Sequence, residues 1–66
     1  MSVAKTIELS AISPTSFEDA IREAITKSGE SLRNIQGAWV KEQKVVIENG
    51  EIAGFQAIIT LTFVVE

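Results

Sequence analysis

The sequence predicts a single α+β domain in which a strand, an amphipathic helix and a long β-hairpin follow one another. Three observations predict this order. Residues 3–11 alternate apolar and polar side chains with the period of two that is typical of a strand. Residues 17–34 repeat apolar side chains at spacings of three and four, as one buried face of a helix does. Asn49-Gly50 then joins two alternating runs, which is a strong hairpin signal.

The expected helix begins near Phe17 and ends near Asn34. Ser16 can cap its first amide groups, and acidic residues follow in the first turn, where the helix dipole favours them. Gly29 weakens the middle of this helix by roughly 1 kcal/mol relative to Ala. The expected buried stripe consists of Phe17, Ala20, Ile21, Ala24, Ile25, Leu32 and Ile35.

The expected hairpin has strands over residues 38–48 and 51–65. A two-residue type I′ turn at Asn49-Gly50 fixes which residues face each other. The expected pairs include Ala38 with Leu61, Trp39 with Thr60, Val40 with Ile59, and Gln43 with Gln56. A bulge would move part of one strand to the other face.

Both faces of this hairpin are apolar. The face that should receive the helix carries Ala38, Val40, Ala53, Phe55, Ala57, Ile59, Leu61, Phe63 and Val65. The opposite face carries Trp39, Lys41, Gln43, Val45, Ile47, Ile52, Gln56, Ile58, Thr60, Thr62 and Val64, which is too apolar a set to be left in water. One helix cannot cover both faces, so we expect another subunit or a ligand to cover the Trp39 face.

Composition favours self-association. The 66 residues form one domain, 1–66, and a chain of this size buries only about 60% of its unfolded surface. Because there is no Cys and no His, disulfides and the usual zinc ligands are excluded, and we expect no metal site. The net charge of −3 and the scattered basic residues argue against nucleic acid as a partner. No apolar run approaches the ~20 residues that span a bilayer, so we expect a cytoplasmic protein and no membrane partner.

The same composition argues against catalysis. Without His or Cys the common general bases and thiol nucleophiles are missing, and a Ser-His-Asp triad is impossible. The carboxylates of the helix are best explained as a solvated surface. We therefore expect no catalytic residues and no enzyme activity.

Trp39 and Gln56 are the residues with binding chemistry. A lone Trp on a sheet face is most often a packing or interface residue. The alternative is a stacking platform, with an indole under a planar ring and a Gln amide presenting donor and acceptor groups to the edge of that ring. In the expected register the two residues lie four positions apart, about 13 Å at about 3.3 Å per residue, so one chain alone would not close such a site.

Several segments together resemble the dodecins, over essentially the whole chain. They are Val-Ala-Lys-Thr-Ile-Glu-Leu near the N-terminus, Ser-Pro-Thr-Ser-Phe-Glu-Asp-Ala-Ile at the start of the helix, Gly37-Ala38-Trp39-Val40-Lys41-Glu42-Gln43 at the start of the hairpin, and Phe55-Gln56 with Thr62-Phe63-Val64-Val65-Glu66 near its end. The resemblance implies a β-α-β-β subunit whose antiparallel sheet wraps around one helix, assembled into a hollow homododecamer of cubic symmetry.

The resemblance also implies a function, which is the storage and photoprotective quenching of flavins. It implies that Trp39 stacks on the isoalloxazine ring, that Gln56 bonds to its pyrimidine edge, and that paired flavins lie between subunits. FMN is the first expectation, with riboflavin or FAD as alternatives. Lys41 and Gln43 share the Trp39 face in the expected register and could contact a ribityl chain or phosphate, or simply be solvated. The alternative function is a flavin-free structural or cation-binding shell with Trp39 as an interface anchor.

Overall fold

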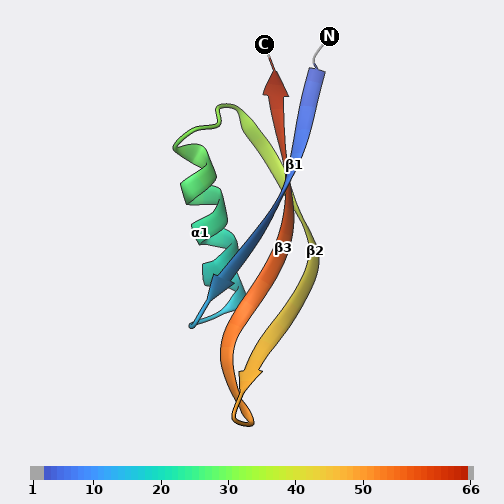
Figure 1. Cartoon of the computed structure of the whole chain (residues 1–66). Coiled ribbons are helices and arrows are strands. Elements are labelled where there is room, and N and C mark those ends of the chain that lie inside the picture. The colour runs from blue at the N-terminus through green and yellow to red at the C-terminus, as the bar shows by residue number, and fades with distance from the viewer. Residues whose placement is uncertain (1–2, 66) are drawn as a thin grey trace.

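The computed structural model describes residues 3–65 and contains one helix and one three-stranded sheet (Figure 1). Strand β1 (Val3–Ser13) leads into helix α1 (Phe17–Gly29), and β2 (Ile35–Glu48) and β3 (Glu51–Val65) form the hairpin. The strand order is β1-β3-β2, and both pairings are antiparallel. The predicted α+β subunit of the β-α-β-β type is confirmed.

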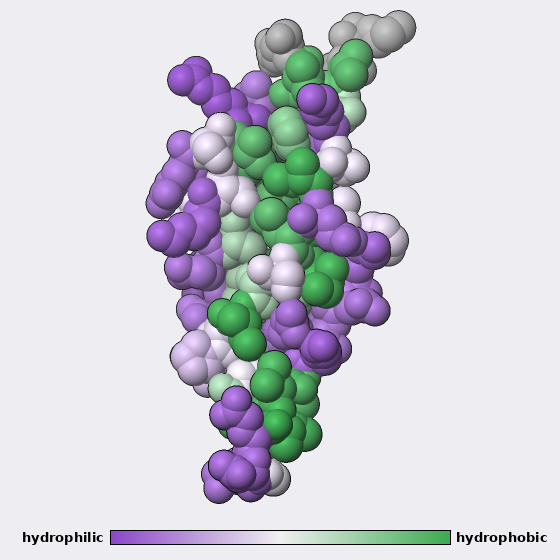
Figure 2. Space-filling view, viewed as in Figure 1, coloured by the Kyte–Doolittle hydropathy of each residue, from purple (hydrophilic) through white to green (hydrophobic). Residues whose placement is uncertain are grey.

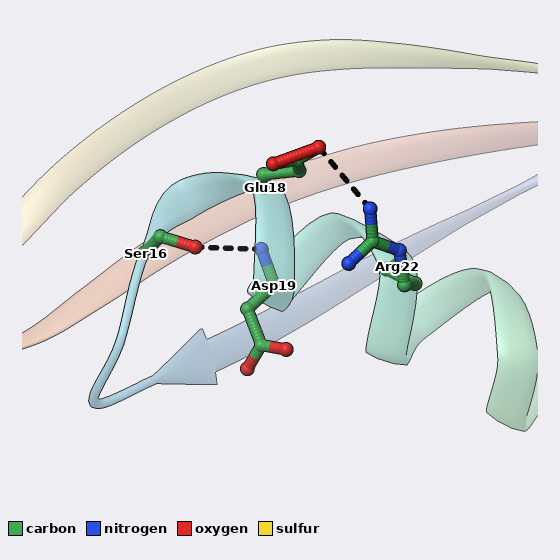
Figure 3. A network of polar contacts seen from close by, with 4 residues as sticks. All are labelled: Ser16, Glu18, Asp19 and Arg22. Carbon is green, nitrogen blue, oxygen red and sulfur yellow. Dashed lines mark hydrogen bonds and ion pairs between the residues drawn. The ribbon is translucent and has the colours of Figure 1, made fainter.

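The start of the helix is as predicted, but its end is not. The Ser16 hydroxyl accepts a hydrogen bond from the backbone N–H of Asp19 at 3.0 Å (Figure 3). The Arg22 guanidinium donates a hydrogen bond of 3.1 Å to the carboxylate of Glu18, one turn earlier in the helix. The helix ends at Gly29 rather than near Asn34. The backbone N–H of Leu32 turns back to the carbonyl of Ser28, which closes the helix early.

Residues after Gly29 therefore belong to a turn and to β2. Asn34 has a positive φ of 61°, the left-handed conformation that Asn tolerates, and it directly precedes β2. Ile35 is the first residue of that strand, three residues earlier than the predicted start at Ala38. Strand β1 is two residues longer than predicted and ends at Ser13, and β3 has the predicted bounds.

The predicted hairpin register is correct from Gly37 to Val40 and next to the turn, and it is shifted by one residue between these two stretches; a further shift at Gln36 precedes them. Ile47 pairs with Ile52 and Trp39 pairs with Thr60, as predicted. Between these pairs Ala53 on β3 and Lys41 on β2 each lack a partner, so two irregularities of opposite effect offset each other. Within the shifted segment Gln43 pairs with Ala57 and Lys44 pairs with Gln56, which corrects the predicted Gln43–Gln56 pair.

The core is small and lies between the helix and the central strand. Ala20 and Ala24 of α1 meet Ala57, Ile59 and Leu61 of β3, and these five are the buried hydrophobic residues of the part that the structure describes. The two alanines let the helix approach the sheet closely. Partly buried neighbours are Ile7, Leu9, Ala11, Ile21, Leu32 and Ile35. The helix packs mainly on β1 and β3, so the helix-side residues of β2 have little covering them.

The chain is strongly elongated for its size. Its principal extents are 51 × 20 × 13 Å and its radius of gyration is 13.6 Å, against about 10.8 Å for a compact domain of this length. A band of hydrophobic side chains runs along the visible face between polar margins (Figure 2). Within residues 3–65 no helix has the length and apolar character to cross a membrane.

Candidate functional site

The candidate site lies on the face of the sheet opposite the helix, which we call the open face. Residues that pair directly in an antiparallel sheet share a face, and Ala57, Ile59 and Leu61 point to the helix. The alternate residues of the sheet therefore form the open face. They include Thr6, Glu8, Ser10 and Ile12 of β1, Gln56, Ile58, Thr60 and Thr62 of β3, and Gly37, Trp39, Glu42 and Lys44 of β2.

Trp39 presents its indole to solvent on this face. Trp39 pairs with Thr60 of β3, which pairs in turn with Glu8 of β1, and we call these three residues the Trp39 row. Trp39 itself is 66% exposed. Gly37, the preceding open-face residue on β2, has open space where a Cβ would lie. No side chain therefore screens the indole from that direction, and a flat aromatic surface is available for stacking.

Lys41 lies beside the Trp39 row and makes an ion pair there. Its ammonium Nζ donates to Glu8 Oε2 at 2.6 Å, which joins the two outer strands across β3. The hydrogen bond from Lys41 to Glu8, reinforced by the attraction between their charges, raises the pKa of Lys41 above its ordinary value of 10.5. Lys41 is therefore a cation throughout the neutral range, and Glu8 is a site neighbour that the sequence pattern alone did not reveal.

Gln56 occupies a second position farther along the open face. Its amide Nε2 donates to the hydroxyl of Ser10 on β1 at 2.8 Å. A shallow depression of about 290 Å³ lies beside it, lined by Glu42, Gln43, Lys44, Gln56 and Ile58. Among the hydrogen bonds of the described residues, the Gln56 amide uses only this one N–H group, so its second N–H and its carbonyl oxygen can serve a ligand.

The structure does not bring Trp39 and Gln56 together within one chain. Trp39 pairs with Thr60, and Gln56 lies four residues before Thr60 on β3, which corresponds to about 13 Å. Trp39 is not among the residues that line the depression beside Gln56. The predicted separation of four positions along the sheet is confirmed.

The prediction that the Gln43 side chain shares the Trp39 face is wrong. The unpaired Lys41 shifts the register by one residue, and such a slip moves a side chain to the opposite face. Gln43 pairs with the buried Ala57. Because β2 is an edge strand, Gln43 borders both the depression beside Gln56 and a groove beside the helix. Lys44, which the sequence pattern did not single out, is the residue directly across from Gln56.

Acidic residues do not gather into a metal site within one chain. Over residues 3–65 no group of three or more side chains of the metal-binding types Asp, Glu, His and Cys lies close enough to hold an ion. The carboxylate of Glu8 is instead engaged by Lys41.

Comparison with known proteins extends these observations. Residues 3–66 match the family model described as Dodecin. The chain is similar to the dodecin of Streptomyces coelicolor, with 28% identity, coverage of 98% of this chain and 93% of the other, and a TM-score of 0.94. It is equally similar in shape to an arginine-to-alanine mutant of the Thermus thermophilus dodecin, with 27% identity, coverage of 100% and 98%, and a TM-score of 0.94.

A third similar structure is that of a calcium dodecin from Mycobacterium tuberculosis, a calcium-chelating antigen with a novel calcium-binding site. It shares 31% identity, with coverage of 94% of this chain and 89% of the other, and a TM-score of 0.85. A search of curated proteins gives no match. The family model covers all but two residues of the sequence, and several dodecin structures superpose over nearly its whole length. This chain is a member of the dodecin family.

Proposed function

We propose that the chain assembles into a homododecamer that binds flavin as a non-enzymatic cytoplasmic store, with FMN as the preferred flavin and riboflavin or FAD as alternatives. The observation that carries this proposal is the 66% exposed indole of Trp39 on a sheet face that one chain leaves uncovered. Membership of a family known for flavin binding supports it.

The residues present fit a planar heteroaromatic ligand. The exposed indole of Trp39 provides a large flat surface. Gln56 provides one N–H donor and one carbonyl acceptor, which match a ring edge that carries both kinds of group. Because the two lie about 13 Å apart in one chain, the proposed site takes residues from neighbouring subunits.

The proposed photoprotection depends on Trp39. A bound isoalloxazine supplies a planar ring that absorbs visible light. If a flavin is bound there, Trp39 would hold the ring, and its indole would serve as a reversible one-electron donor through which the excitation would be lost without net chemistry. Lys41, beside the Trp39 row, is the proposed contact for a ribityl chain or phosphate.

The test is a titration of the purified protein with FMN, and with riboflavin and FAD in parallel, followed by flavin fluorescence. We expect quenching on binding. Trp39→Ala should abolish quenching and weaken affinity by about fivefold to more than a hundredfold, because stacking of a planar base on an aromatic side chain contributes about 1–3 kcal/mol. Val3→Ala, which truncates a similarly exposed residue that pairs with Val65, five positions along β3 from the partner of Trp39, should change neither. Undiminished affinity in Trp39→Ala would exclude the stacking role.

A cation-binding shell is the second candidate, because the similar structure with 31% identity is described as a calcium dodecin. In that case the protein would be colourless and indifferent to flavin. Calorimetric titration with Ca²⁺ would show saturable binding, and Trp39→Ala would disassemble the shell because Trp39 would then be an interface anchor.

A further inference from the structure

The hairpin tip is an exposed apolar projection. Ile47 and Ile52 pair directly just before the turn, and they are 61% and 58% exposed. The tip lies beyond the start of the helix: Phe17, the first helical residue, packs edge-on against Phe55, with ring centroids 5.2 Å apart, and Ile52 is three residues nearer the turn (Figure 1). The helix of the same chain therefore does not cover the tip.

A mostly apolar groove of about 490 Å³ lies between the helix and β2. Its lining consists of Phe17, Glu18, Ile21, Arg22, Ile25, Thr26 and Gln43. Ile25 is 37% exposed although it belongs to the apolar stripe of the helix. The groove exists because the helix packs on β1 and β3 and leaves β2 at the margin.

The tip cannot enter the groove of its own chain. The two strands of the hairpin pair from Ile47–Ile52 back to Val45–Phe55, with only Ala53 unpaired between them, and this ladder carries the tip past the start of the helix (Figure 1). The tip of the same chain therefore leaves the groove open.

One charged side chain of the groove is available to the acidic end of the tip. Glu48 and Glu51 pair directly next to the isoleucines, and like charges facing each other across a sheet destabilise it. Arg22 lines the groove and pairs with Glu18 of the same groove at 3.1 Å, but both side chains are largely exposed and an exposed pair contributes little to stability. Arg22 can therefore exchange Glu18 for the tip carboxylates of another copy.

The chain as a whole exposes more surface than a compact monomer, which leaves area for contacts between copies. The chain exposes 4831 Å², whereas a compact monomer of 7.2 kDa is expected to expose about 4,100 Å². The excess of roughly 700 Å² is close to the ~800 Å² that each partner buries in a standard protein interface.

We infer that the hairpin tip of one copy, with Ile47 and Ile52, inserts into the groove between α1 and β2 of another copy. This inference rests on the proposed self-assembly and specifies one of its contacts. Because tip and groove are different surfaces, each chain inserts its tip into one neighbour and accepts the tip of another. A finite assembly then requires that these contacts form a closed ring of copies.

Cysteine cross-linking tests this contact, since the natural chain has no Cys. We would combine Ile47→Cys with Ile25→Cys in one chain, oxidise mildly, and separate the products on a non-reducing gel. A chain with one Cys at the tip and one in the groove should give a ladder of linked copies beyond the dimer. Each single variant is the matched control and should give little dimer. Ile47→Cys with Ile21→Cys samples a second groove position.

The outcomes separate this contact from the wider proposal. If neither pair gives a ladder while native mass spectrometry shows the assembly and flavin is still quenched, the tip-in-groove contact is overturned and the proposed function stands. Dimers of the single variants as abundant as the products of the pair would also overturn it. A wild-type chain that is monomeric by native mass would overturn both proposals. A ladder that Arg22→Glu diminishes and Glu51→Lys restores would establish the contact.

Discussion

Ser13 is the buried polar residue that organises the start of the helix. It is 2% exposed, its hydroxyl donates to Asp19 Oδ2 at 2.7 Å, and the same oxygen accepts the backbone N–H groups of Thr15 and Ser16. One hydroxyl thus ties the end of β1 to the first turn of α1.

Replacing Ser13 with Ala should destabilise the fold by about 1–3 kcal/mol, because the carboxylate of Asp19 and two amide groups lose their partner in a partly buried site. The measurement is the urea midpoint at fixed protein concentration. Ser31→Ala, at an exposed serine, should stay within about 0.5 kcal/mol of the wild type. Equal midpoints for both variants would contradict the role assigned to Ser13.

The Lys41–Glu8 pair gives a pH dependence at the alkaline end. The pKa of Lys41 is raised in the folded chain, so the pair stabilises the protein below pH 10.5 and its contribution is lost as the pH rises through the raised value. Glu8→Gln should therefore melt below the wild type at pH 8, and the gap should close above the pKa of Lys41. The gap should also shrink in about 1 M salt, since the pair is exposed. A gap that persists at high pH would refute this assignment.

Side-chain type and spacing predicted part of the candidate site. The exposure of Trp39 and its distance from Gln56 followed from alternation along a strand. Ser10 and Glu8 were missed because their role depends on β1 lying next to β3, and a sequence pattern does not give that neighbour. Gln43 was placed on the wrong face because nothing in the sequence marks Lys41 as unpaired.

The elements were predictable wherever local chemistry decides. The Ser16 cap and the Asn49-Gly50 turn are short-range signals, and both are present, with Asn49 and Gly50 at positive φ. The end of the helix was not predictable from its apolar spacing. Leu32 and Ile35 continue the helical spacing in the sequence, but Leu32 lies after the helix and Ile35 begins β2. Both are apolar because they pack against the core from these positions, and not because the helix extends to them.

The hairpin turn should be sensitive at Gly50. Its φ of 76° lies in the left-handed region, where an L-residue with a Cβ is disfavoured by about 1–2 kcal/mol. Gly50→Ala should lower the unfolding free energy by that amount in a urea titration. Gly29→Ala is the contrasting variant, since a Cβ there meets open space, and it should be neutral or stabilise the helix by about 0.5–1 kcal/mol. Equal effects at both glycines would exclude turn strain as the cause.

At the scale of the whole molecule, the isolated subunit is poorly covered. Five buried hydrophobic residues, three of them alanine, form the centre of the described core, while large side chains such as Ile47, Ile52 and Trp39 are exposed. The small size and the absence of Cys and His predicted this shortage. The elongated shape was not predictable, because it depends on how far the hairpin extends past the helix.

Stability should therefore depend on protein concentration. If neighbouring copies cover the exposed faces, dilution favours the dissociated and unfolded chain by mass action. The melting temperature, followed by circular dichroism from about 1 to 100 µM, should rise with concentration. Coincident melting curves over this range would show that one chain is stable without its neighbours.

The strand order has a consequence for folding during synthesis. β1 pairs along its whole length with β3, so Val3 finds its partner only at Val65. The ribosome makes the outer strand β1 first and the central strand last, so β1 has no sheet partner until β3 emerges, when Ser13 can pair with Phe55 first and Val3 with Val65 last. The hairpin, whose contacts are local, can form first and then provide the template on which the N-terminal strand docks. The strand that is made first is thus the strand that completes its pairing last.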